Sequence, residues 1–105
     1  MIKRLEALLQ QGQDNALLRF GLGNAYLDAG EAQNAVVHLR AALEHDSTYS
    51  AAWKRLGQAF AECHQWQQAL EAYQKGIQAA ELKGDIQAGK EMRVFLKRVQ
   101  RTLDQ

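Results

Sequence analysis

Apolar residues recur along this chain at the three- and four-residue spacing of amphipathic helices. Leu18, Leu22 and Tyr26 lie four residues apart, and the next segment places Ala35 and Leu39 in the same relation. No segment alternates between apolar and polar residues for long enough to form a strand. The pattern therefore predicts an all-α chain.

Turn and cap residues divide this pattern into about six helices. Asp14 or Asn15 can cap the first long helix, and Gly30 can end it. Gly84 and Asp85 are typical of a helix end followed by a new cap, which favours a break there over one helix from 65 to 103. After a short N-terminal helix, the predicted helices span 16–29, 31–45, 51–63, 65–82 and 85–103.

A shift of 34 residues aligns one part of the chain with another. It places Leu22 and Gly23 on Leu56 and Gly57, and the other aligned positions are also apolar or small. Such a period indicates stacked helical repeats. We therefore expect a single domain over 1–105, with an N-terminal helix at 2–12, repeats at 16–49 and 50–83, and a C-terminal capping helix or half-repeat at 84–104.

The aligned residues resemble the tetratricopeptide repeat (TPR), which carries W-x2-L-G-x2-Y, then A-x3-F and a closing proline. The residues that carry the resemblance are Leu22, Gly23, Tyr26, Ala35, Trp53, Leu56, Gly57, Phe60, Ala69 and Tyr73. The resemblance implies a right-handed superhelix of helical hairpins, in which the glycines allow close helix approach. Two departures stand out: His64 replaces the turn glycine of the second repeat, and the chain has no proline.

The resemblance also implies a function. Stacked TPRs bind a peptide or helix of a partner protein in a concave groove lined by the first helix of each repeat, so we expect a non-catalytic scaffold, adaptor or co-chaperone-like module. The groove positions carried over are Leu17, Phe20, Asn24, Leu27, Lys54, Arg55, Gln58 and Glu62. Lys54 and Arg55 could hold a partner's carboxylate, whereas the apolar residues could equally pack under the N-terminal helix.

The last helix leaves two alternatives open. Its apolar residues recur at heptad-like spacing and could pair between chains in a homodimer; they are Met92, Phe95, Leu96, Val99 and Leu103. Four of its basic residues could instead dock an acidic partner; they are Lys90, Arg93, Lys97 and Arg101. Nucleic acid is a weaker version of this second alternative, because no aromatic residues are interleaved to stack bases.

Composition argues against other classes of protein. The 13 Lys+Arg and 12 Asp+Glu give a formal charge of +1, which provides no overall field for nucleic acid or anionic membranes. One cysteine cannot form an internal disulfide or a Cys-based zinc site, and the three histidines have no metal-ligand spacing. Residues 84–91 have the Gly-x4-Gly-Lys skeleton of a phosphate-binding loop but end in Glu91 instead of Ser or Thr. We therefore expect no cofactor, no metal and no catalysis.

The absence of a signal peptide or apolar span predicts a cytoplasmic protein without a membrane partner.

Overall fold

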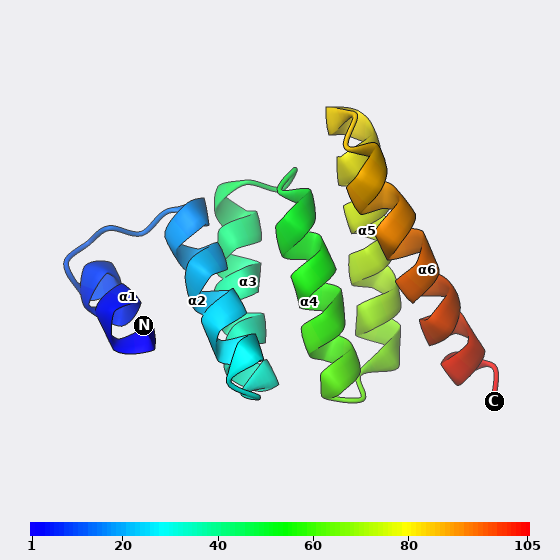
Figure 1. The fold of residues 1–105 in the computed structure, drawn as a ribbon, viewed down its shortest axis with the longest axis horizontal. Coiled ribbons are helices and arrows are strands. Elements are labelled where there is room, and N and C mark those ends of the chain that lie inside the picture. The colour runs from blue at the N-terminus through cyan, green and yellow to red at the C-terminus, as the bar shows by residue number, and fades with distance from the viewer.

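The computed structural model describes residues 1–105 as six helices without a strand (Figure 1). They are α1 (Ile2–Gln10), α2 (Ala16–Asp28), α3 (Ala32–His45), α4 (Ser50–Glu62), α5 (Trp66–Lys83) and α6 (Ile86–Leu103). Gly84 ends α5 in the left-handed conformation at φ 70°, and the Asp85 side chain caps α6 by accepting from the amide of Ala88. The predicted all-α fold and the break between the last two helices are confirmed.

The helices form two layers. Figure 1 shows α2 and α4 side by side in front, with α3 and α5 behind them, and α6 beside α5 at the C-terminal end. Each of α2 and α4 packs on the helix that follows it, and α4 also contacts α2 and α6. The resulting stack is elongated, with principal extents of 44 × 29 × 18 Å.

The turns within the two hairpins have the same backbone geometry despite different sequences. Gly30 occupies the first turn at φ 79°, and His64 occupies the second at φ 58°. In both turns the amide of the following residue donates to a carbonyl at 2.9 Å, that of Tyr26 in the first and that of Phe60 in the second. The second turn therefore places a histidine in a backbone region that favours glycine.

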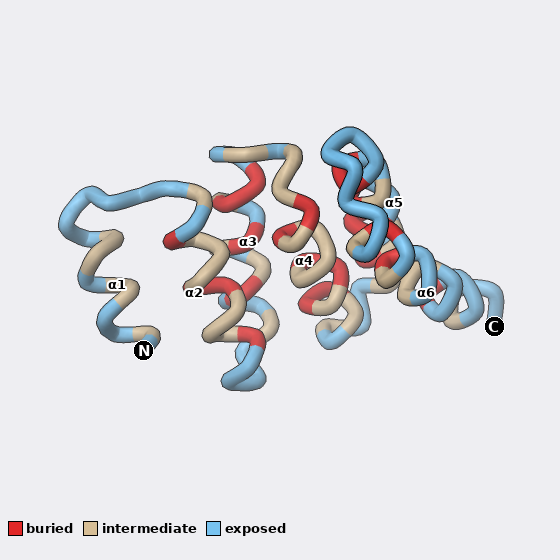
Figure 2. The backbone as a smooth tube through the Cα atoms, turned by 45° about the horizontal axis from the view of Figure 1, so that its top comes forward, coloured by how far each residue is buried: buried red, intermediate tan, exposed pale blue.

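The core lies between the two layers, along the red segments of Figure 2. In the second hairpin, an added Cβ atom on Gly57 would lie 2.4 Å from Tyr73 Cε1. In the first hairpin, a Cβ atom on Gly23 would lie 2.5 Å from Leu39 Cγ. Tyr73 is 2% exposed and its ring stacks on Phe95 at 5.7 Å. The two glycines thus admit large side chains from the neighbouring helix into contact with the backbone.

The apolar side of α6 faces the rest of the same chain. Met92 and Val99 are buried, and Phe95 and Leu96 pack against the core, while Leu103 is 40% exposed. The residues considered for pairing between chains are therefore mostly occupied by α5 and its neighbours. A second chain could use them only after α6 had left α5.

The N-terminal helix α1 is attached more loosely. None of its nine residues is buried, and it packs only on α2. Leu5 lies over Gly21, with its Cδ1 3.6 Å from the position of an added Cβ atom. The hydroxyl of Tyr26 donates to the carboxylate of Glu6. The half-buried apolar residues of α1 and one hydrogen bond thus connect it to α2, without a fully buried residue.

Candidate functional site

Four of the predicted groove residues fall on the α2–α4–α6 surface, which is formed by the adjacent sides of these three helices. Lys54, Arg55 and Gln58 lie on one side of α4, because each α-helical residue turns about 100° from the last. Arg55 and Asn24 meet across the α2–α4 boundary, and Lys54 and Glu91 meet across the α4–α6 boundary. The structure therefore brings four of the eight predicted residues together.

Arg55 is bonded to its own chain through all three guanidinium nitrogens. Its Nε donates to Asn24 Oδ1 at 2.7 Å, its Nη2 to Asp28 Oδ1 at 2.7 Å and its Nη1 to Gln58 Oε1 at 2.9 Å. Because Asn24 and Asp28 belong to α2, Arg55 joins the first helices of the two hairpins. It also orients the amides of Asn24 and Gln58.

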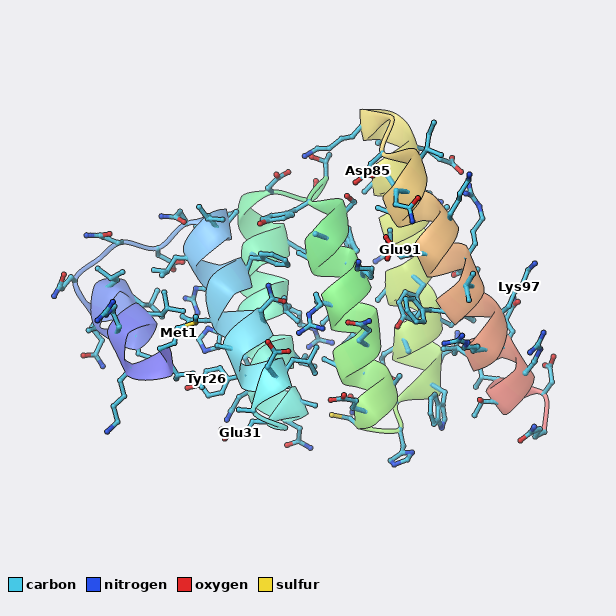
Figure 3. All side chains as sticks on the ribbon, viewed as in Figure 1. Met1, Tyr26, Glu31, Asp85, Glu91 and Lys97 are labelled. Atoms are coloured by element: carbon cyan, nitrogen blue, oxygen red, sulfur yellow. The ribbon has the colours of Figure 1, made fainter.

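Lys54 has a weaker partner. Its Nζ lies 3.5 Å from Glu91 Oε2, longer than the about 2.8 Å of a strong charged hydrogen bond. The Lys54 side chain is 25% exposed, so its ammonium group is accessible from solvent. Figure 3 shows Glu91 on the side of α6 turned towards α4 and Lys97 on the outer side. Glu91 was missed in the sequence, since α6 lacks the signature that would align it with α2 and α4.

The predicted apolar groove residues are not brought together. Leu17 is 72% exposed, whereas Leu27 is 6% exposed and belongs to the core. Phe20 packs against Tyr49 with 4.8 Å between the ring centroids and the rings tilted by 37°. Glu62 is exposed at the C-terminal end of α4, beside the turn between α2 and α3. The α2–α4–α6 surface is consequently polar near its middle, with Phe20 as its aromatic edge.

The basic residues of α6 lie outside this surface. Lys90, Arg93, Lys97 and Arg101 are exposed. Arg93 donates to Glu81 at 2.7 Å, so one of the four is engaged within the chain. The others have no ion pair.

A cavity of about 400 Å³ lies on the opposite side of α4, between α3 and α5. We call it the α3–α5 cavity. Its floor is Trp53, Leu56 and Phe60 from α4, and its walls include Arg40 and Glu44 from α3 and Glu71 and Lys75 from α5. In the sequence, the three floor residues belong to the set that carries the TPR resemblance. The charged residues on the two neighbouring helices stand at i and i+4, the spacing of ordinary helix-surface ion pairs, so they give no signal of a cavity before α3 and α5 are placed side by side.

A polar cluster joins the loop before α2 to α3. Arg19 donates from Nε and Nη2 to Asp14 at 2.8 and 3.0 Å, and His45 Nε2 lies 3.0 Å from Asp14 Oδ1. Hydrogen bonds from Arg19 and His45 hold the pKa of the Asp14 carboxyl far below its usual range. Arg19 Nη1 lies 3.0 Å from His38 Nδ1, and burial followed by the nearby Arg19 charge lowers the pKa of His38.

The histidines and carboxylates do not form a candidate metal centre. No group of three or more His, Cys, Asp or Glu side chains is placed to hold an ion. None of the six helices combines the length and apolar character needed to cross a membrane.

Comparison with known proteins gives consistent matches. A family model described as tetratricopeptide repeat matches residues 26–90. A TPR repeat-containing protein of Pseudomonas aeruginosa is 50% identical over 101 residues, covering 96% of each chain. The solution structure of a Bordetella parapertussis protein is 46% identical with a TM-score of 0.84, covering 97% of this chain and 89% of that one. The first TPR of Spaghetti, solved bound to an HSP90 peptide, is 16% identical with a TM-score of 0.74, covering 98% of this chain and 90% of that one.

Proposed function

Because this chain belongs to the tetratricopeptide repeat family, we propose that it binds a peptide or helix of a partner protein on the α2–α4–α6 surface. Members of the family are generally non-catalytic protein-interaction modules, and this chain has their fold. In this role it acts as a scaffold or adaptor in the cytoplasm.

The observation that supports this site is the set of oriented polar groups on α2 and α4. Arg55 holds the amides of Asn24 and Gln58 at 2.7 and 2.9 Å, and all three side chains are half-buried. A peptide backbone has donors and acceptors that such amides can meet. Side chains that are already oriented lose less conformational entropy when a partner binds. The peptide bound to the Spaghetti TPR, whose fold is similar, is consistent with this mode.

Lys54 and Arg55 have different roles in this proposal. Arg55 positions Asn24 and Gln58, since a partner's carboxylate would first have to displace Asp28 from it. Lys54 is the cation that meets the partner, because its 3.5 Å contact with Glu91 is easily exchanged. We therefore expect partner segments with a carboxylate near Lys54.

The test begins with a pull-down from the native source and the synthesis of overlapping peptides from the captured protein. Titration of a binding peptide into ¹⁵N-labelled protein should shift the amide signals of Asn24, Lys54 and Gln58 most strongly. The Lys54→Ala/Gln58→Ala double variant keeps Arg55 in place and should weaken binding about tenfold or more.

A matched control removes one lysine and one glutamine elsewhere. Lys3→Ala/Gln33→Ala changes two exposed residues of α1 and α3 and should leave peptide affinity unchanged. Shift changes confined to α3 and α5, or equal losses in both double variants, would place the partner site elsewhere.

A further inference from the structure

The first helix occupies a place in the stack that longer helices occupy further along. Tyr26 on α2 and Phe60 on α4 are 34 residues apart, so the repeat makes them equivalent. The Tyr26 hydroxyl donates to the carboxylate of Glu6 on α1. The guanidinium carbon of Arg40 on α3 lies 5.2 Å from the Phe60 ring centroid. Thus α1 packs on α2 as α3 packs on α4, and we call the side of α2 between Gly21 and Tyr26 the entry face.

The helix that covers the entry face is short and shallow. α1 has nine residues and none of them is buried, whereas α3 and α5 have 14 and 18 residues and both contain buried ones. Figure 2 shows this contrast, since α1 has no red segment. Leu17 lies one turn before Gly21 on α2 and is 72% exposed. α1 therefore leaves an apolar side chain uncovered at the edge of the face.

α1 can leave the entry face without disturbing the two hairpins, because it packs on no helix other than α2. Residues 11–13 are exposed, and an added Cβ atom on Gly12 would meet nothing within 4 Å. Asp14 stays bonded to Arg19 at the start of α2, so these three residues are the hinge. No side chain caps the N-terminus of α1, and a helix of nine residues is marginal by itself in water.

The contacts of α1 indicate which kind of segment fits the entry face. Leu5 Cδ1 lies 3.6 Å from the position of an added Cβ atom on Gly21, so the glycine leaves room for a leucine. At the other edge of the face, the Tyr26 hydroxyl donates to a carboxylate, and Figure 3 shows Tyr26 on the side of α2 turned towards α1. The half-buried residues of α1 are Ile2, Leu5, Glu6, Leu8 and Leu9. The face thus accepts a helix with an apolar stripe and a glutamate beside one of its leucines.

We propose that an amphipathic helix of a partner protein displaces α1 and packs on the entry face. That helix is about as long as α3, presents a leucine to Gly21 and a carboxylate to Tyr26, and reaches Leu17 with its additional turn. It replaces the tethered α1 because it buries more apolar area. Asn24, which Arg55 holds, lies on another side of α2, so this inference stands whether or not the α2–α4–α6 surface binds a peptide.

The probe is a fluorescein-labelled peptide of about 14 residues that contains the sequence of residues 2–10 and continues its leucine stripe for one more turn. Its twin has the same composition with the leucines spread around the helix. In fluorescence anisotropy titrations with the full chain, the striped peptide should bind and the twin should not. Gly21→Arg should weaken binding about tenfold or more, because the new side chain fills the room of the leucine. Circular dichroism verifies that the variant is folded.

A second variant tests displacement itself. Leu5→Ala/Leu9→Ala weakens the attachment of α1 and should tighten peptide binding about fivefold or more, because the competing helix leaves the face more often. The matched control, Val37→Ala/Val94→Ala, shortens two exposed aliphatic residues of α3 and α6 and should change the affinity less than twofold.

Three results would overturn the proposal: no binding of the striped peptide, equal binding of its twin, or unchanged or weaker binding in Leu5→Ala/Leu9→Ala. Loss of binding in Lys54→Ala/Gln58→Ala, with Gly21→Arg unaffected, would also overturn it and would assign the peptide to the α2–α4–α6 surface.

Discussion

Gly57→Ala and Gly89→Ala should change the stability of this protein in opposite directions. Both glycines are buried inside α-helices, so helix propensity alone predicts a gain of up to about 1 kcal/mol for each alanine. The surroundings of the two positions differ. At Gly57 the new Cβ atom would lie 2.4, 2.6 and 2.7 Å from three atoms of the Tyr73 ring. At Gly89 the nearest atoms are Arg93 Nη1 at 3.3 Å and Ala80 Cβ at 3.8 Å.

The magnitude depends on which neighbour can move. Tyr73 is 2% exposed and stacked on Phe95, so its ring cannot move without disturbing the contact between α5 and α6. Overpacking of this kind costs about 1–3 kcal/mol. Because three atoms of a buried ring overlap, the cost lies in the upper half of this range, about 2–3 kcal/mol. After subtraction of a propensity gain of about 1 kcal/mol, we expect Gly57→Ala to lower the free energy of unfolding by about 1–2 kcal/mol. The flexible end of Arg93 can move away, so Gly89→Ala should raise it by about 0.5–1 kcal/mol.

Thermal and urea unfolding followed by far-UV circular dichroism measure both changes. For a domain of this size 1 kcal/mol corresponds to about 4–8 °C in Tm, so a difference of about 1.5–3 kcal/mol should separate the Tm values of the two variants by at least about 6 °C. Repeating Gly57→Ala in a Tyr73→Leu background should reduce its cost, because the smaller side chain relieves the overlap. A change of the same sign in both alanine variants, or full additivity with Tyr73→Leu, would refute the steric explanation.

Three further predictions concern the turn, the α2–α4–α6 surface and the polar cluster. His64→Gly should raise the free energy of unfolding by about 0.5–1 kcal/mol, because glycine adopts the φ of 58° without strain. Thermal unfolding checks this, and a lower Tm would show that the lost contact of His64 with Trp66 outweighs the relief of backbone strain. In urea unfolding, Arg55→Ala should lower the free energy of unfolding by about 1–2 kcal/mol and Lys54→Ala by less than about 0.5 kcal/mol. The reason is that only Arg55 makes two short hydrogen bonds to α2, and equal losses in the two variants would contradict it. His38 has a pKa below its unfolded value of 6.5, so folding favours its neutral form. Its contribution to the free energy of unfolding is complete above pH 6.5 and is lost as the pH falls through the folded pKa. Urea unfolding from about pH 7.5 to 5 should therefore show a loss of stability that is smaller in His38→Gln.

The helices could be predicted from sequence because their signals are local. Each apolar stripe lies within one helix, and the break between α5 and α6 follows from two adjacent residues, Gly84 and Asp85. The close approach at Gly57 also followed, since the glycine recurs after 34 residues within the same pattern. Positions that repeat in sequence take equivalent places in the stack.

The bonding of the site residues could not be read from the sequence in the same way. Arg55 has its acceptors 31 and 27 positions away, and no local pattern distinguishes a bonded arginine from a free one. Glu91 reaches Lys54 only because α6 lies beside α4, in a segment without the repeat signature. The α3–α5 cavity likewise depends on the distance between two helices that do not follow each other in the chain.

The loose attachment of α1 has a consequence for how the native protein opens. Since none of its residues is buried and it touches only α2, releasing it costs less free energy than unfolding the two hairpins. In native-state hydrogen–deuterium exchange, the amides of α1 should exchange by local opening at all denaturant concentrations. Those around Leu39 and Tyr73 should exchange only when the whole stack unfolds. The chain therefore behaves as two units of unequal stability, and the smaller one covers Gly21 and Tyr26 of α2 only part of the time.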